Sequence, residues 1–207
     1  MALRDQPIAT QSQVPTASAT VGPFFPAHFI GATDHDLTRR HPQGAQAQGH
    51  MIYVTGRVFE AARVPRWNTI IELCQADAQG IYAHPADPRH AQADPHFMGW
   101  GRCATDQIGA FSFLTVMPSG YVDPLTQAKR APHLELSVSG SGLMRRLRTT
   151  LFFADLVDNT HDPVWTVVPP ARRDALLLRP VAPIAQIPCW SIDLVLQGES
   201  ETPFFVD

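Results

Sequence analysis

Three side chains close together in the sequence could bind a metal ion. Tyr121 follows a Pro-Ser-Gly turn, and His133 and Glu135 stand two residues apart in an alternating run. Phenolate, imidazole and carboxylate groups are suitable donors for Fe³⁺. Side chains two apart on a strand share a face, so Glu135 can reach the face that carries His133. Arg130 adds a fixed positive charge nearby. An ordinary buried tyrosine and histidine would give the same spacing, so a metal site and a structural role both stay open.

Two predicted strands carry these residues. Residues 110–115 alternate small or aliphatic with aromatic or β-branched side chains, and this period of two favours a strand over a helix. Residues 134–139 alternate again, and His133 stands at the start of that run. Met117 to Gly120 have turn chemistry, because proline lacks a donor and glycine accepts left-handed dihedrals. We therefore expect Tyr121 and His133 at the ends of neighbouring strands.

The rest of the chain favours a mainly β fold with one or two short helices. Further strand patterns cover residues 51–59, 67–76, 145–153 and 188–197, and a short helix is possible at 172–178. In the first strand, Gly56 indicates a bulge or a close backbone approach. Residues 81–99 show neither helical nor strand periodicity, and this segment is longer than an ordinary connection. Both properties are typical of functional loops.

Composition limits the possible classes of function. The 207 residues allow one domain, which we expect at 20–207 after a loose arm at 1–19. A net charge of −3 without a long basic run gives no support for nucleic-acid binding. The 3 cysteines lack CxxC spacing, and neither a GxSxG motif nor a phosphate-binding glycine loop is present. No leader or membrane-span pattern occurs, so we expect a cytoplasmic protein.

Several motifs together resemble the intradiol ring-cleavage dioxygenases. They are the run from Trp67 to Ala76 followed by DAQGIY at 77–82, GR at 101–102 with TD at 105–106 and Gly109, and APH at 131–133. Near the C-terminus, LQGE at 196–199 and ETPFF at 201–205 are similar to the alpha chains of the protocatechuate 3,4-dioxygenase branch, as is TVGPF at 20–24. The resemblance extends from about Val14 to Asp207.

This resemblance implies a β-sandwich of mixed topology and an oligomer of αβ units. In that branch the beta chain holds non-haem Fe³⁺ with two tyrosines and two histidines. The complex converts protocatechuate and O₂ into 3-carboxy-cis,cis-muconate. The expected partner of this chain is therefore a beta subunit, with protocatechuate and O₂ as substrates of the complex.

The ligand set implied by the resemblance is incomplete in this chain. Tyr121 and His133 match one tyrosine and one histidine ligand, and Arg130 matches an arginine that precedes the histidines in beta chains. Counted without gaps, Arg89 stands at the other tyrosine position and Glu135 at the other histidine position. A guanidinium has no lone pair to donate to a metal. We therefore expect no iron on this chain, with Tyr121 and His133 as remnants of a site.

The alpha chains of the branch contribute an N-terminal segment to the pocket of the beta chain. It maps here to Thr20, Gly22, Pro23 and Phe24, while a substrate-facing arginine of alpha chains aligns with Ser141. The first hypothesis is thus a structural, pocket-lining alpha subunit. One alternative is a self-sufficient ferric dioxygenase with an atypical ligand set, and another is a β-sandwich binding module without chemistry.

Overall fold

The computed structural model describes residues 30–154, 156 and 159–205. The expected arm at 1–19 and the expected pocket residues Thr20, Gly22, Pro23 and Phe24 lie outside these ranges. The predicted domain boundary at residue 20 therefore stays a prediction.

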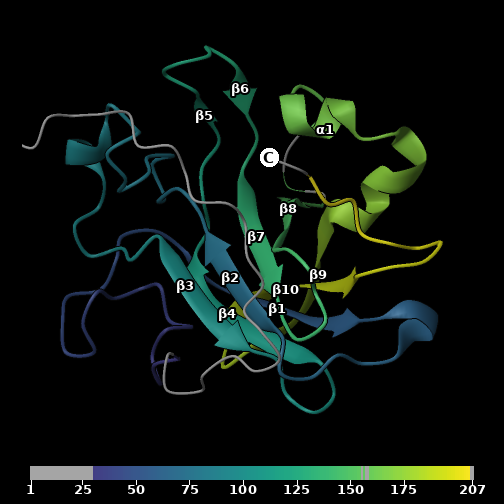
Figure 1. Ribbon diagram of the computed structural model, residues 1–207. Helices are drawn as coiled ribbons and strands as arrows, with labels where there is room; N and C mark the ends of the chain where they lie inside the picture. The colour runs from purple at the N-terminus through teal and green to yellow at the C-terminus, as the bar shows by residue number, and fades with distance from the viewer. Residues whose placement is uncertain (1–29, 155, 157–158, 206–207) are drawn as a thin grey trace, which may run out of the picture.

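Eight strands form one hydrogen-bonded sheet of mixed topology (Figure 1). The strand order is β3-β2-β7-β8-β9-β10-β1-β4. Most neighbours are antiparallel, but β1 with β10 and β8 with β9 are parallel. The bounds are β1 Met51–Phe59, β2 Ile70–Cys74, β3 Trp100–Ala104, β4 Ala110–Val116, β7 His133–Ser139, β8 Leu147–Phe153, β9 Leu177–Ile184 and β10 Ile187–Val195. The predicted mainly β fold of mixed topology is confirmed.

The sheet curves until its two end strands, β3 and β4, contact each other. A single apolar core fills the space enclosed. Val54 of β1 and Phe113 of β4 belong to the same buried cluster as Leu73 of β2 and Leu136 of β7. Alternation explains this arrangement, because inward residues of β1 such as Val54 are fully buried while Arg57 is exposed. The core fixes β7, the strand that begins at His133.

Most of the predicted strands are present. The run 51–59 forms β1, the run 67–76 contains β2 between β3 and β7, and the remaining runs contain all of β8 and most of β4, β7 and β10. A Cβ on Gly56 would lie 2.2 Å from the carbonyl oxygen of Ile192, so the close approach expected there is also confirmed. The possible helix at 172–178 is a 3-10 helix at Pro170–Leu176, and β9 begins directly after it.

The relation between Tyr121 and His133 differs from the expectation. β4 lies at one end of the sheet, whereas β7 lies between β2 and β8, so the two strands are not neighbours. Tyr121 instead belongs to a separate hairpin formed by β5 (Tyr121–Val122) and β6 (Lys129–Arg130), in which Tyr121 pairs with Arg130. The chain then passes from β6 through Ala131 and Pro132 into β7, so the hairpin brings the phenol to the start of β7.

One short α-helix lies at the same end of the sheet. α1 (Pro163–Val167) lies beside the β5–β6 hairpin in Figure 1. The side chain of Asp162 caps its first turn by accepting from the backbone N–H of Val164 at 2.8 Å. Two further 3-10 helices lie at Ala61–Arg63 and His90–Gln92. Among the described residues, no helix has the length and apolar character needed to cross a bilayer.

Candidate functional site

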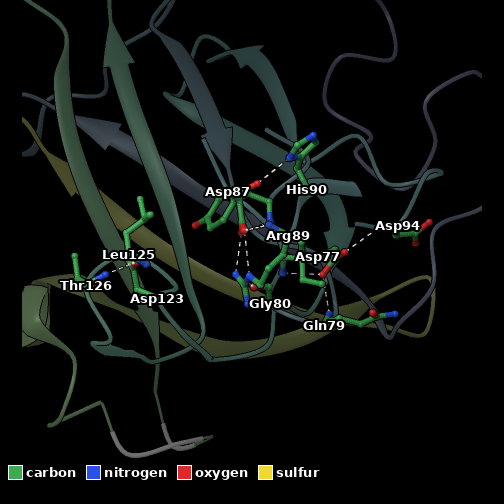
Figure 2. Close-up of polar contacts among 12 residues, drawn as sticks. Asp77, Gln79, Gly80, Asp87, Arg89, His90, Asp94, Asp123, Leu125 and Thr126 are labelled. Atoms are coloured by element: carbon green, nitrogen blue, oxygen red, sulfur yellow. Dashed lines mark hydrogen bonds and ion pairs between the residues drawn. The ribbon is translucent and has the colours of Figure 1, made fainter. Parts of the chain in front are cut away.

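Buried carboxylates shape the loop that follows β2. Asp77 is 1% exposed, and its Oδ1 accepts from the backbone N–H groups of Gln79 at 2.9 Å and Ile81 at 3.0 Å. Its Oδ2 accepts from the N–H of Asp94 at 2.9 Å, which ties together the two ends of the loop (Figure 2). Because each carboxylate oxygen satisfies a buried donor, a loop with neither helical nor strand periodicity still has a defined path. Tyr82 is the first residue after this turn.

Arg89 belongs to a second carboxylate cluster in the same loop. Its Nε and Nη2 donate to the two oxygens of Asp87 at 3.0 and 2.8 Å, and Nη2 also donates to the carbonyl of Gly80 at 2.9 Å (Figure 2). The hydrogen bonds from Arg89 lower the pKa of Asp87 to about 2. The guanidinium carbon lies 5.4 Å from the centre of the Tyr121 ring. Arg89 therefore fastens the loop and packs on Tyr121.

Tyr82, which the sequence patterns did not assign to the site, contacts His133. Its hydroxyl lies 3.3 Å from Nε2 of His133, and its ring meets that of Tyr121 edge to face at 5.9 Å. Tyr82 thus adds a phenol beside His133 that the comparison of ligand positions did not count, and the match of Arg89 with the second tyrosine position stays a prediction. Two local features of the sequence are compatible with such a role, although neither places Tyr82 beside His133. Tyr82 directly follows a turn, and of the 3 tyrosines in the chain Tyr53 lies inside a regular strand.

His133 is buried, and both of its ring nitrogens have partners. Nδ1 lies 2.7 Å from the carbonyl oxygen of Ala131, which can only accept, so Nδ1 carries the proton. Nε2 therefore presents its lone pair, and this lone pair accepts a hydrogen bond from Nη2 of Arg130 at 3.1 Å. Burial and, after it, the nearby charge of Arg130 lower the pKa of His133, so the ring is neutral at neutral pH.

Arg130 is held against His133 by a buried carboxylate. Its Nε donates to Oδ2 of Asp162 at 2.9 Å, and the side chain of Asp162 is 0% exposed. The same oxygen accepts from the N–H of Ala131 at 2.9 Å, while Oδ1 caps α1. Asp162 thus joins the start of β7 to the helix and fixes the guanidinium.

Glu135 also reaches the site, as its spacing from His133 predicted. Its Oε1 lies 3.5 Å from Nε2 of His133 and 3.7 Å from Nη2 of Arg130. Both carboxylate oxygens also lie 3.1 Å from the hydroxyl of Thr150 on β8. The residues around His133, called the centre below, therefore include one permanent cation, Arg130. It lies between the carboxylates of Glu135 and Asp162 and next to a neutral imidazole.

The two phenols face a cavity of about 270 Å³. Its lining includes Tyr82 and Tyr121 together with Cys74, His84, Asp87 and Leu125. Burial, followed by the charges of neighbouring acidic groups, raises the pKa of Tyr82. Burial raises the pKa of Tyr121 as well, against the opposing effect of Arg130. Both phenols are therefore protonated at neutral pH.

As arranged, these side chains do not fit a ferric ion. Iron bound by His133 would need the lone pair of Nε2, which accepts from a guanidinium that cannot lose its charge. Elsewhere, within the part of the chain that the structure describes, no three His, Cys, Asp or Glu side chains form a metal-binding group.

Ser141, which the resemblance aligns with a substrate-facing arginine, lies apart from this site. Ser141 follows β7, and its carbonyl oxygen accepts a hydrogen bond from Arg66. With Val64, Trp67 and other residues it lines a separate cavity of about 430 Å³. The described residues therefore do not bring Ser141 to the tyrosines.

A family model described as Dioxygenase matches residues 20–197. The chain belongs to the intradiol dioxygenase family. It is 35% identical to the beta chain of protocatechuate 3,4-dioxygenase from Burkholderia cepacia, over 87% of this chain and 79% of that protein. It is 29% identical to the alpha chain from Pseudomonas putida, over 92% of this chain and 95% of that protein. The expected similarity to an alpha chain is thus confirmed, and a beta chain matches as well.

Solved structures support the same intradiol dioxygenase fold. An intradiol ring-cleavage dioxygenase from Tetranychus urticae superposes with a TM-score of 0.60 over 86% of this chain and 92% of that one, at 16% identity. At this identity the likeness concerns the fold alone.

Proposed function

We propose that this intradiol dioxygenase chain is an alpha-type subunit of a protocatechuate 3,4-dioxygenase, in which a beta subunit carries the iron. The contact between Arg130 and His133, in a chain where Glu135 attracts the same guanidinium, carries the proposal. It places a permanent cation at the imidazole lone pair that a metal would need. The similarity to alpha chains over 92% of this chain supports the same assignment. In the complex this chain supplies fold and pocket walls, and protocatechuate and O₂ react at the partner.

Co-purification tests the assignment. The full chain is co-expressed with a histidine-tagged beta chain from the same genome, and a single-chain catechol 1,2-dioxygenase with the same tag serves as control. We expect this chain to be retained by the beta chain alone, and ring cleavage of protocatechuate to exceed that of the beta chain by itself. Absence of a complex would contradict the assignment. A complex without any gain in turnover would instead favour a binding module.

A second candidate function follows from the position of Tyr82. Two phenols, an imidazole and a carboxylate meet at the centre, and this donor set suits ferric iron once the protons and the guanidinium are displaced. A self-sufficient dioxygenase would carry iron and cleave a catechol without a partner. His133→Ala would abolish both properties, whereas in the alpha-type subunit this substitution affects neither.

A further inference from the structure

Several side chains near His133 can donate to a metal, and a guanidinium contacts the same imidazole. Nε2 of His133 lies 3.3 Å from the hydroxyl of Tyr82 and 3.5 Å from Oε1 of Glu135. The ring of Tyr121 lies 6.0 Å from the imidazole, centre to centre. Nη2 of Arg130 lies 3.1 Å from the same Nε2 and 3.7 Å from Glu135. Two of these donors, His133 and Glu135, therefore contact the side chain of Arg130.

Two anions keep Arg130 in this place. Asp162 is fully buried and is held in turn by its bonds to Ala131 and to the first turn of α1, so it cannot follow the arginine outward. Glu135 attracts the guanidinium from the side of β7. By the resemblance, beta chains have a neutral histidine at the position of Glu135. They bind iron although an arginine stands at the position of Arg130. A carboxylate at position 135 therefore adds an attraction that a neutral ligand lacks.

We infer that Arg130 is an internal cation which occupies the metal position beside His133 and keeps Tyr82, Tyr121, His133 and Glu135 from binding ferric iron. The inference rests on the proposed function, since it gives the reason why this chain carries no iron. Without the guanidinium, Nε2 of His133 keeps only the hydroxyl of Tyr82 nearby, itself a metal donor, and the two carboxylates lack a counter-charge. An uncompensated buried charge is strongly unfavourable, so a metal cation is the natural replacement.

The test is ferric iron binding by the full chain and its Arg130→Met variant. Each protein is incubated with ferric citrate and desalted, and then iron per chain and the visible phenolate-to-iron absorption are measured. We expect the variant to retain at least about tenfold more iron than the wild type, because a like charge a few ångströms away is removed. Addition of His133→Ala to the variant should abolish the gain and the colour.

Two further variants control for general charge effects and for misfolding. Arg89→Met removes a cation that packs on Tyr121 without touching His133, so it should bind no more iron than the wild type. If Arg130→Met does not fold because Asp162 loses its partner, Arg130→Met/Asp162→Asn removes both charges and keeps a capping side chain. Cooperative unfolding in urea identifies the folded variants.

The outcomes separate the two proposals. Iron-free wild type together with an iron-binding Arg130→Met, alone or with Asp162→Asn, supports the inference. Folded variants that remain iron-free overturn it and leave the alpha-type assignment standing. Gain of iron by Arg89→Met to the same extent would also overturn it, because the effect would then be general electrostatics. Stoichiometric iron in the wild type would overturn the proposed function itself.

Discussion

Replacement of Asp162 by alanine should strongly destabilise the chain. Asp162 is 0% exposed and Arg130 is 15% exposed, so the substitution leaves a largely buried guanidinium without its anion. Removal of one partner of a buried ion pair costs about 3–5 kcal/mol, and loss of a helix cap about 1 kcal/mol more. Because the two losses share one side chain, we expect a total of about 4 kcal/mol. For a chain of this length that lowers Tm by about 8–16 °C.

Urea unfolding followed by circular dichroism measures this effect. Asp162→Asn keeps the cap and an acceptor for Arg130 but loses the charge, so it should cost about 2 kcal/mol. Asp174→Ala is the surface control, because the side chains of Asp174 and its partner Arg179 are 77% and 54% exposed. Such exposed pairs contribute about 0–1 kcal/mol. Equal effects of Asp162→Ala and Asp174→Ala would refute the view that Asp162 anchors the centre.

Two further predictions concern the loop and the sheet. Hydrogen bonding to Arg89 lowers the pKa of Asp87 from 3.8 to about 2, so this contribution to stability is complete above pH 3.8 and is lost as the pH falls through 2. Asp87→Asn should therefore be less stable than the wild type in urea at pH 6, with a difference that narrows toward pH 2; a constant difference would contradict the link. Gly56→Ala should cost about 1–3 kcal/mol, because the added Cβ meets the carbonyl of Ile192 at 2.2 Å and the Phe111 ring at 2.6 Å. An unchanged urea midpoint would show that β1 moves freely at this point.

The strands that alternate clearly could be predicted from the sequence. β1 was predicted with its observed bounds, because one face is apolar throughout and the other is mixed. β9 was missed because its outer half is exposed and contains Pro180 and Pro183, which argue against a regular strand. β3 was missed because WGRCA has no alternation, so its place depends on pairing with β2. The pairing of strands that are distant in the sequence cannot be predicted from the local pattern of either strand.

Only part of the candidate site could be predicted, because several of its contacts join residues that are distant in the sequence. Glu135 could be placed beside His133, since their spacing within one strand determines a common face. Tyr82 could not, because its position depends on Asp77 and on backbone bonds from residues far along the loop. The role of Asp162 also depends on tertiary structure, since its partner Arg130 is 32 residues away in sequence. A hydrogen-bonded loop leaves no periodic signal in its sequence.

The central claim is that a guanidinium takes the place of iron in this chain. Its most direct test is the iron content and visible absorption spectrum of the wild-type chain purified alone after growth with added iron. We predict a colourless protein with far less than one iron per chain. A coloured protein with stoichiometric ferric iron, lost in His133→Ala, would contradict the claim and would establish Tyr82, Tyr121, His133 and Glu135 as a working metal centre.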